Sequence, residues 1–119
     1  MGWTITFHPL FEREYMALPR GVQTALAAKV LLLVQFGPRL GRPHVDTLKA
    51  SKHLNMKELR FDAANGVWRV AFAFDPQRKA VLLLGGDKSG GGEKRFYKEL
   101  IAGADLRFDQ HLEALKAVK

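Results

Sequence analysis

The sequence of 119 residues contains no cysteine, which excludes disulfide bonds, thiolate metal sites and cysteine nucleophiles. Long hydrophobic runs are also missing. The most apolar stretch, residues 22–36, is interrupted by polar side chains and falls short of the roughly 20 apolar residues of a membrane span. The first residues lack the basic segment and apolar run of a secretory signal. We therefore expect a cytoplasmic protein with no membrane partner.

Acidic residues are few compared with basic ones: 12 Asp and Glu stand against 19 Lys and Arg, which gives a formal net charge of +7. On a small domain such an excess favours a polyanionic partner, and nucleic acid before a membrane, because each neutralised phosphate releases counterions. A basic protein that binds no nucleic acid is the alternative. The histidines show no metal-ligand spacing, so neither a metal nor another cofactor is expected.

The length fits a single domain, residues 1–119, and a 47% hydrophobic composition is enough for a modest core. Apolar and polar residues alternate over residues 3–7, which predicts a half-buried strand. Helical spacing then predicts two helices, at about 9–18 and 20–36, divided by Pro19. The N-terminal part is therefore expected to form a helical hairpin.

The second half of the sequence changes to the two-residue period of strands. Three segments rich in β-branched and aromatic residues carry this period: Met56–Phe61, Val67–Phe74 and Ala80–Gly85. Their short links predict an antiparallel meander. We expect an irregular connection over residues 39–55, and a helix from Glu93 onward with a break near Gly103. The predicted fold class is α+β, a small antiparallel or mixed sheet packed against the helical hairpin and a C-terminal helix.

Strand alternation places two arginines on one face of the predicted sheet. In each strand the larger apolar side chains must face the core, so Arg60 and Arg69 face away from it. Either plausible hairpin register leaves the two arginines directly opposite or diagonal, where like charges repel. A carboxylate such as Glu58 or a bound phosphate can offset this repulsion, and the sequence leaves both explanations open.

Lys88 follows the last predicted strand and can overhang the same face. Small residues are expected to form the floor of that face: Ala71, Ala73, Gly85 and Gly86. Converging cations above such a floor are typical of a nucleic-acid groove. We therefore expect an open cationic face with room for a nucleic-acid backbone.

Two further residues have side chains suited to proton transfer. His53 lies in a basic stretch, and its imidazole suits proton transfer near neutral pH, although a structural role is the alternative. Tyr97 can stack a base or donate a proton, with core packing as the alternative. The glycine-rich segment 85–92 lacks the order of a phosphate-binding loop and is expected to be flexible.

Four segments in chain order form a recognisable combination. They are Asn55–Arg60 (NMKELR), Trp68–Asp75 (WRVAFAFD), Leu83–Lys88 (LLGGDK) and Lys94–Tyr97 (KRFY). This combination resembles the HigB-like, phage-derived branch of the RelE/ParE toxin superfamily. The resemblance implies a compact α+β fold and a type II toxin that cleaves mRNA in the ribosomal A site. It also implies a cognate antitoxin that silences the toxin, in this branch often a helix-turn-helix protein.

The resemblance implies that Arg60, Arg69 and Lys88 are the basic active-site residues, and we add His53 and Tyr97 as catalytic candidates. Metal-free RNA cleavage needs a base for the 2′-hydroxyl, cations for the phosphate and an acid for the departing 5′-oxygen. His53, Lys57 or Lys88 are candidates for the base, and Tyr97 or a lysine for the acid. The residues expected to contact RNA are Lys49, Lys52, Lys57, Lys94 and Arg95.

Two other functions stay open, a non-catalytic ParE-like toxin that acts on DNA gyrase and an RNA-binding module without chemistry. The cluster of Arg60, Arg69 and Lys88 favours the nuclease.

The partner surface is predicted from helix 20–36, which is apolar on more than one side. The second apolar stripe of this helix is either covered by the first helix or exposed for antitoxin binding. Its residues are Ala27, Leu31 and Val34.

Overall fold

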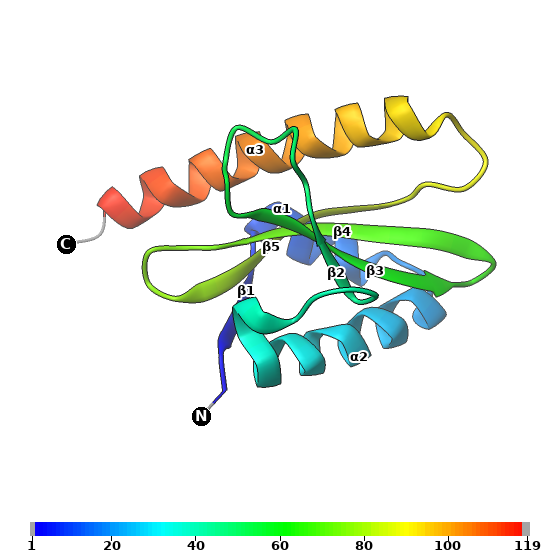
Figure 1. The fold of residues 1–119 in the computed structure, drawn as a ribbon, viewed down its shortest axis with the longest axis horizontal. Coiled ribbons are helices and arrows are strands. Elements are labelled where there is room, and N and C mark those ends of the chain that lie inside the picture. The colour runs from blue at the N-terminus through cyan, green and yellow to red at the C-terminus, as the bar shows by residue number, and fades with distance from the viewer. Residues whose placement is uncertain (1, 118–119) are drawn as a thin grey trace.

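The computed structural model describes residues 2–117, which form a five-stranded sheet between two helical layers (Figure 1). The strands, in chain order, are β1 (Thr4–Phe7), β2 (Val45–Thr47), β3 (Met56–Ala63), β4 (Gly66–Phe74) and β5 (Lys79–Asp87). Their spatial order is β1-β5-β4-β3-β2, with β1 parallel to β5 and every other pair antiparallel. The α+β class and the meander of β3, β4 and β5 are confirmed.

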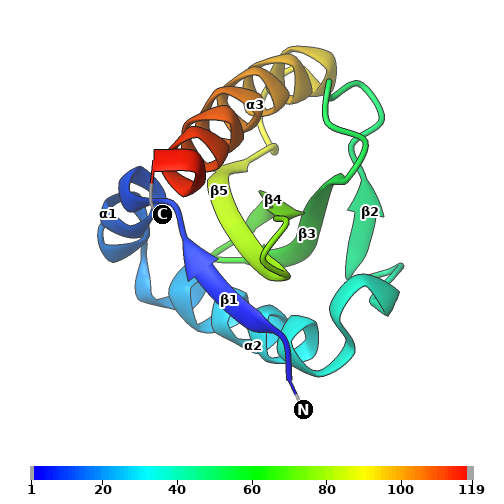
Figure 2. The same ribbon diagram turned by 90° about the vertical axis from the view of Figure 1, so that its left-hand side faces the viewer.

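The helices divide between the two faces of the sheet (Figure 2). Helices α1 (Pro9–Met16) and α2 (Arg20–Phe36) cover one face, and a short 3-10 turn, η1 (Gly37–Arg39), follows α2. Helix α3 (Glu93–Ala117) covers the other face. We call these the hairpin face and the α3 face of the sheet.

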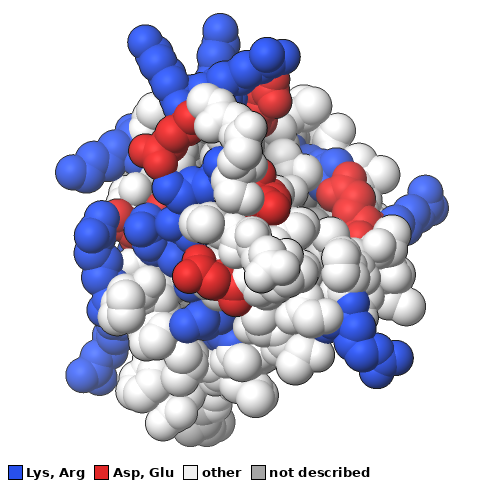
Figure 3. Space-filling model, turned by 90° about the vertical axis from the view of Figure 1, so that its right-hand side faces the viewer, with Lys and Arg blue, Asp and Glu red and all other residues white. Residues whose placement is uncertain are grey.

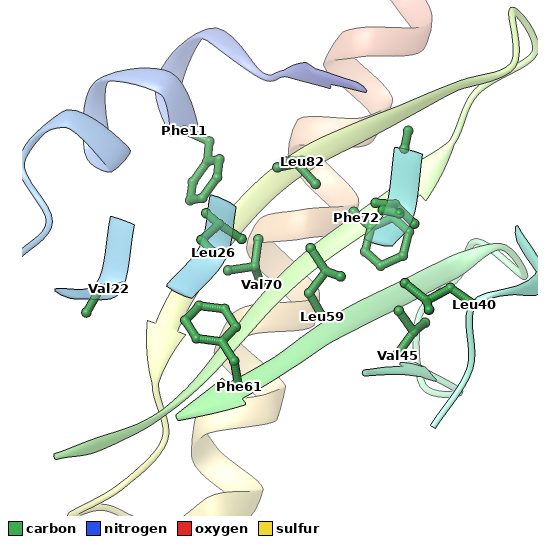
Figure 4. Close-up of a cluster of buried hydrophobic side chains, with 12 residues drawn as sticks. Phe11, Val22, Leu26, Leu40, Val45, Leu59, Phe61, Val70, Phe72 and Leu82 are labelled. Carbon is green, nitrogen blue, oxygen red and sulfur yellow. The ribbon is translucent and has the colours of Figure 1, made fainter. Parts of the chain in front are cut away.

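Each face has its own hydrophobic core. The core on the hairpin face is shown in Figure 4 and includes Phe11, Val22, Leu26, Leu59, Val70, Phe72 and Leu82. The core on the α3 face includes Met56, Ala71, Ala73, Val81, Leu83, Leu100, Ala104 and Phe108. The prediction that Ala71 and Ala73 floor an open face is wrong, because both are fully buried beneath α3. Small side chains there allow the apolar stripe of α3 to pack closely on β4.

Two predicted features of the backbone are also corrected. The connection expected over residues 39–55 contains β2, in which Val45 pairs with Leu59 of β3. Helix α3 runs through Gly103 without a break. A Cβ atom at Gly103 would lie 2.5 Å from Leu84 Cδ2, so this glycine lets the helix approach β5 instead of ending it.

The sheet register brings Arg60 directly opposite Arg69. Ala64 and Asn65 form the β3–β4 turn, both with positive φ. Phe72 pairs with Leu82, and a bulge between Ala71 and Phe72 shifts the register of β4 against β5. Arg69 therefore lies opposite Gly86.

Helix α2 packs one of its faces against the sheet. By length and composition alone the segment Arg20–Arg39 is long and apolar enough to cross a membrane, contrary to the expectation from its interrupting polar residues. In the structure Val22, Leu26 and Leu33 are fully buried against the sheet. The second stripe is not covered by α1, which packs mainly on β5 and β1. Its residues Ala27 and Leu31 are exposed and Val34 is half-buried, with Leu31 70% exposed.

Candidate active site

The predicted arginines lie at one end of the sheet, where the Tyr97 side chain from the start of α3 reaches residues of β3 and β4. Arg60 comes from β3, Arg69 from β4 and Tyr97 from α3, while Lys88 directly follows β5. Figure 3 looks at this end of the molecule and shows Lys and Arg side chains gathered around it, with Asp and Glu among them. Three strands and one helix therefore bring these four side chains together.

The centre of this cluster is the carboxylate of Glu58, whose side chain is only 4% exposed. Its Oε2 accepts a hydrogen bond from Arg60 Nη1 at 2.8 Å, and its Oε1 accepts one from the Tyr97 hydroxyl at 2.8 Å. Arg69 Nε lies 3.7 Å from the same Oε1. Glu58 therefore offsets the repulsion between the two arginines. Glu58 was predicted only as a neutralising group, although its strand position already put it on the same face as Arg60.

Arg69 is held more tightly than Arg60. Its Nε donates a hydrogen bond to the Tyr97 hydroxyl at 3.2 Å, and its Nη1 donates one to the Trp68 carbonyl at 2.8 Å. The side chain of Arg69 is 7% exposed, whereas that of Arg60 is 26% exposed. Arg60 is thus the arginine that a ligand in solvent can reach.

Tyr97 is a hydroxyl donor in this environment. Burial, and next the hydrogen bond to Glu58, raise the pKa of Tyr97 above its ordinary value, and the hydrogen bond from Arg69 only partly opposes this. A raised pKa keeps the phenol protonated through the neutral range. Tyr97 can therefore supply a proton near neutral pH but cannot serve there as a base.

The segment after β5 holds Lys88 in place. The Lys88 backbone N–H donates to the Val67 carbonyl at 2.8 Å. The Asp87 Oδ1 accepts from the backbone N–H groups of Val67 and Ser89 and from the Ser89 hydroxyl, at 3.0, 2.9 and 2.6 Å. These Ser89 hydrogen bonds lower the pKa of Asp87. The Lys88 ammonium pairs with Glu93 at 2.5 Å, so the loop expected to be flexible begins with an ordered turn.

His53 lies away from this cluster. Its Nε2 is 2.8 Å from Asp109 Oδ1, and Lys52 Nζ is 2.5 Å from the other oxygen of the same carboxylate. Asp109 lies roughly 18 Å beyond Tyr97 along the axis of α3, at about 1.5 Å per residue. The structure therefore does not bring His53 or Lys52 to Arg60 and Arg69.

The other basic residues predicted to contact RNA lie in three places. Lys57 has the same strand orientation as Leu59, so its side chain lies on the hairpin face of the sheet. Arg60 lies on the α3 face, and Lys57 is therefore not part of this site. Lys49 is exposed on the loop after β2. Lys94 and Arg95 are exposed on the first turn of α3, close to Tyr97. Within residues 2–117, no three His, Asp or Glu side chains are grouped so as to hold a metal ion.

The fold built around this site is that of the RelE toxins. The chain matches the free state of a double arginine-to-alanine mutant of the E. coli toxin RelE with a TM-score of 0.64. The match covers 90% of this chain and 98% of that one, at 14% sequence identity, and so shows the common fold.

Sequence comparisons place the chain within a family. The model of the family described as phage-derived protein Gp49-like matches residues 13–109. The chain is 46% identical over 104 residues to the inferred toxin HigB3 of Mycobacterium tuberculosis, covering 87% of this chain and 89% of that protein. It is 37% identical to the inferred toxin HigB2 of the same organism, and it spans 59% of that protein's length. The chain therefore belongs to the phage-derived Gp49-like family.

The resemblance drawn from the sequence motifs is thereby confirmed. The chain is a RelE/HigB-like toxin of the type II toxin–antitoxin class, a class in which mRNA cleavage is the general activity. Membership of this class implies a cognate antitoxin as partner.

Proposed function

We propose that this toxin is a metal-independent endoribonuclease that cleaves mRNA on the ribosome and so inhibits translation. The observation that supports this most strongly is the convergence of Arg60 and the Tyr97 hydroxyl on the buried carboxylate of Glu58. Lys88 pairs with Glu93, a carboxylate that also lies close enough to Arg69 and Arg60 to interact with their charges. RNA cleavage without a metal requires cations, a proton donor and a base, and the carboxylate of Glu58 can serve as the base.

The cations divide into two roles according to their exposure. Arg60 and Lys88 are partly exposed and can bind the non-bridging oxygens of the scissile phosphate. Arg69 is buried against Tyr97 and Glu58, so it acts as a positioning residue. Phosphate binding draws Arg60 away from Glu58, which frees Oε2 of Glu58 to accept a proton.

The proton transfers then balance within the cluster. The 2′-hydroxyl gives its proton to Glu58 as its oxygen bonds to phosphorus. The bond from phosphorus to the 5′-oxygen breaks, and that oxygen takes the proton of Tyr97. The products are a 2′,3′-cyclic phosphate and a 5′-hydroxyl. The hydrogen bond of 2.8 Å between Tyr97 and Glu58 returns the proton to the phenol and restores both groups.

The dependence on the ribosome follows from the charges of the free protein. Arg60 is paired with Glu58, and Lys88 with Glu93. An RNA phosphate must compete with these carboxylates, which makes the isolated protein a poor nuclease. The ribosome supplies mRNA already fixed in position, and fixing a reactant in this way offsets the entropic cost of ordering it.

Replacing Tyr97 with phenylalanine should lower cleavage by about a hundredfold or more, the scale of a lost general acid. The fold should survive because the ring still packs edge-to-face on Phe96. A proton donor is lost as the pH rises through its pKa, and the pKa of Tyr97 is raised. Deprotonation of Tyr97 should therefore not lower the wild-type cleavage rate anywhere in the neutral pH range. Cleavage on programmed ribosomes, measured together with melting temperature, tests this; a folded Tyr97→Phe variant with the wild-type rate would contradict the role.

The antitoxin contact is proposed on the exposed stripe of α2, formed by Ala27, Leu31 and Val34. An exposed apolar patch of this kind marks a binding surface, and a helix-turn-helix antitoxin is the expected partner. Leu31→Glu should weaken antitoxin binding and leave the free toxin folded and active, because this side chain is 70% exposed. The matched control is Leu106→Glu on α3, where the leucine is 59% exposed. Equal affinity for both variants and the wild type would place the antitoxin elsewhere.

A further inference from the structure

The first residue of α3, Glu93, takes no part in the proton transfers proposed above. Its Oε1 lies 2.5 Å from the ammonium nitrogen of Lys88. The Lys88 side chain is 20% exposed and that of Glu93 is 67% exposed, so the carboxylate is on the solvent side of the ammonium group. An RNA phosphate that approaches Lys88 from solvent therefore meets the Glu93 carboxylate first.

The position that this carboxylate occupies is cationic. The hydrogen bond from Lys88, followed by the charge of the same lysine, lowers the pKa of Glu93, and the charges of Arg69 and Arg60 add to this effect. A lowered pKa keeps the carboxylate ionised throughout the neutral range, because the pair is lost only as the pH falls through that pKa. Glu93 is therefore a negatively charged group at a place where the cations of the site attract an anion.

Glu93 can leave Lys88 without a change in the fold. The three glycines before it, residues 90–92, are exposed, and a Cβ atom on any of them would meet no other atom within 4 Å. The Lys88 backbone, in contrast, is fixed by its hydrogen bond to the Val67 carbonyl. Rotation of the Glu93 side chain into solvent is therefore enough to uncover a lysine whose backbone stays in place.

We propose that in the free toxin the Glu93 carboxylate occupies the place of an RNA phosphate on Lys88, and that Glu93 thereby restricts the toxin to RNA held by the ribosome. This inference rests on the proposed function. Free RNA bears the cost of its own ordering as well as that of displacing Glu93, whereas mRNA on the ribosome is already ordered. Glu93 is thus a residue that determines specificity for the state of the RNA.

A carboxylate in the first turn of a helix has a second possible role, because it interacts favourably with the helix dipole. That role needs no contact with Lys88, and its loss lowers stability without changing the affinity for RNA. Melting temperature and RNA affinity, measured on the same variants, therefore separate the two roles of Glu93.

The test is the binding of a short 2′-O-methyl RNA, which cannot be cut, in about 0.15 M salt, where exposed charges more than about 8 Å apart are largely screened. Glu93→Gln removes the competing charge and should tighten RNA binding about two- to fivefold, the scale of one ion pair between partly exposed groups. Glu113→Gln is the matched control. Glu113 pairs with Lys116 at 3.5 Å and lies about 30 Å from Glu93 along the same helix, at about 1.5 Å per residue.

Two further measurements test whether the effect acts through Lys88 and on binding alone. Lys88→Ala removes the cation for which Glu93 and the phosphate compete, so Glu93→Gln should no longer tighten RNA binding in that background. On programmed ribosomes at saturating toxin, Glu93→Gln should leave the single-turnover cleavage rate unchanged, because the carboxylate is already displaced in the bound complex.

Four outcomes would overturn the inference. They are wild-type RNA affinity in a folded Glu93→Gln variant, an equal gain in Glu113→Gln, a gain that persists without Lys88, and a fall in the saturating cleavage rate of Glu93→Gln. Failure of the proposed function looks different. In that case Glu93→Gln still tightens RNA binding through Lys88, while ribosome-bound mRNA stays intact with every variant and with the wild type.

Discussion

Replacing Arg60 with alanine should lower mRNA cleavage about tenfold to a thousandfold, the usual scale for one lost electrostatic stabiliser. The fold should survive, because the Arg60 side chain is partly exposed and Glu58 keeps its hydrogen bond from Tyr97. The matched control is Arg13→Ala, because Arg13 is an exposed arginine of α1, which packs on β5 and β1 away from the cluster. Loss of that charge should leave the cleavage rate unchanged.

The measurement for Arg60 is single-turnover cleavage on programmed ribosomes, with melting temperature recorded for each variant. Equal rates for wild type, Arg60→Ala and Arg13→Ala, with all three folded, would remove Arg60 from the site. Equal losses for both variants would mean that general positive charge, and not the Glu58 cluster, drives the activity.

Replacing Arg69 with alanine should mainly destabilise the protein, lowering the free energy of unfolding by about 3 kcal/mol or more. Removing Arg69 leaves the buried carboxylate of Glu58 with one cation fewer and takes a donor from both Tyr97 and the Trp68 carbonyl. That loss is a large fraction of the roughly 5–15 kcal/mol that stabilises a small domain. The strand pattern predicted that Arg69 lies on an open face, but that face is covered by α3.

Urea unfolding of three proteins tests this explanation: wild type, Arg69→Ala, and the double variant Arg69→Ala/Glu58→Gln. The double variant should recover part of the lost stability, because a neutral amide leaves no unpaired charge in the interior. An unfolding midpoint for Arg69→Ala equal to that of the wild type would show that the buried network adds no stability. A low activity of Arg69→Ala alone is therefore not evidence for a direct part in catalysis.

Local sequence rules predicted the part of the site that lies within one hairpin. Strand alternation predicted that Arg60 and Arg69 share a face, because a shift by one residue would move every apolar side chain to the wrong face. It left a direct and a diagonal register open, and the structure has the direct one. Glu58 falls on the same face by the same rule. Its role as the centre of the cluster was not predicted, because Tyr97 reaches it from an element far away in the sequence.

The sequence pattern did not predict that the α3 face of the sheet is covered by a helix. In β4 large residues alternate with alanines, and this pattern fits both a strand with one exposed face and a strand buried on both sides. Packing of α3 decides between them, and Gly103 lets the helix lie close to Leu84. His53 was misplaced for a similar reason: its loop follows β2, a three-residue strand too short to be detected from its pattern, and is attached to the far half of α3.

The most direct test of the proposed activity is to map mRNA 5′ ends after a short pulse of toxin expression in cells, comparing wild type with Arg60→Ala. We expect new 5′-hydroxyl ends within translated regions for the wild type, with protein synthesis failing before DNA replication. The Arg60→Ala variant should give few such ends at the same level of folded protein. Intact mRNA in cells whose replication stops first would contradict this function and favour a toxin that acts on DNA gyrase.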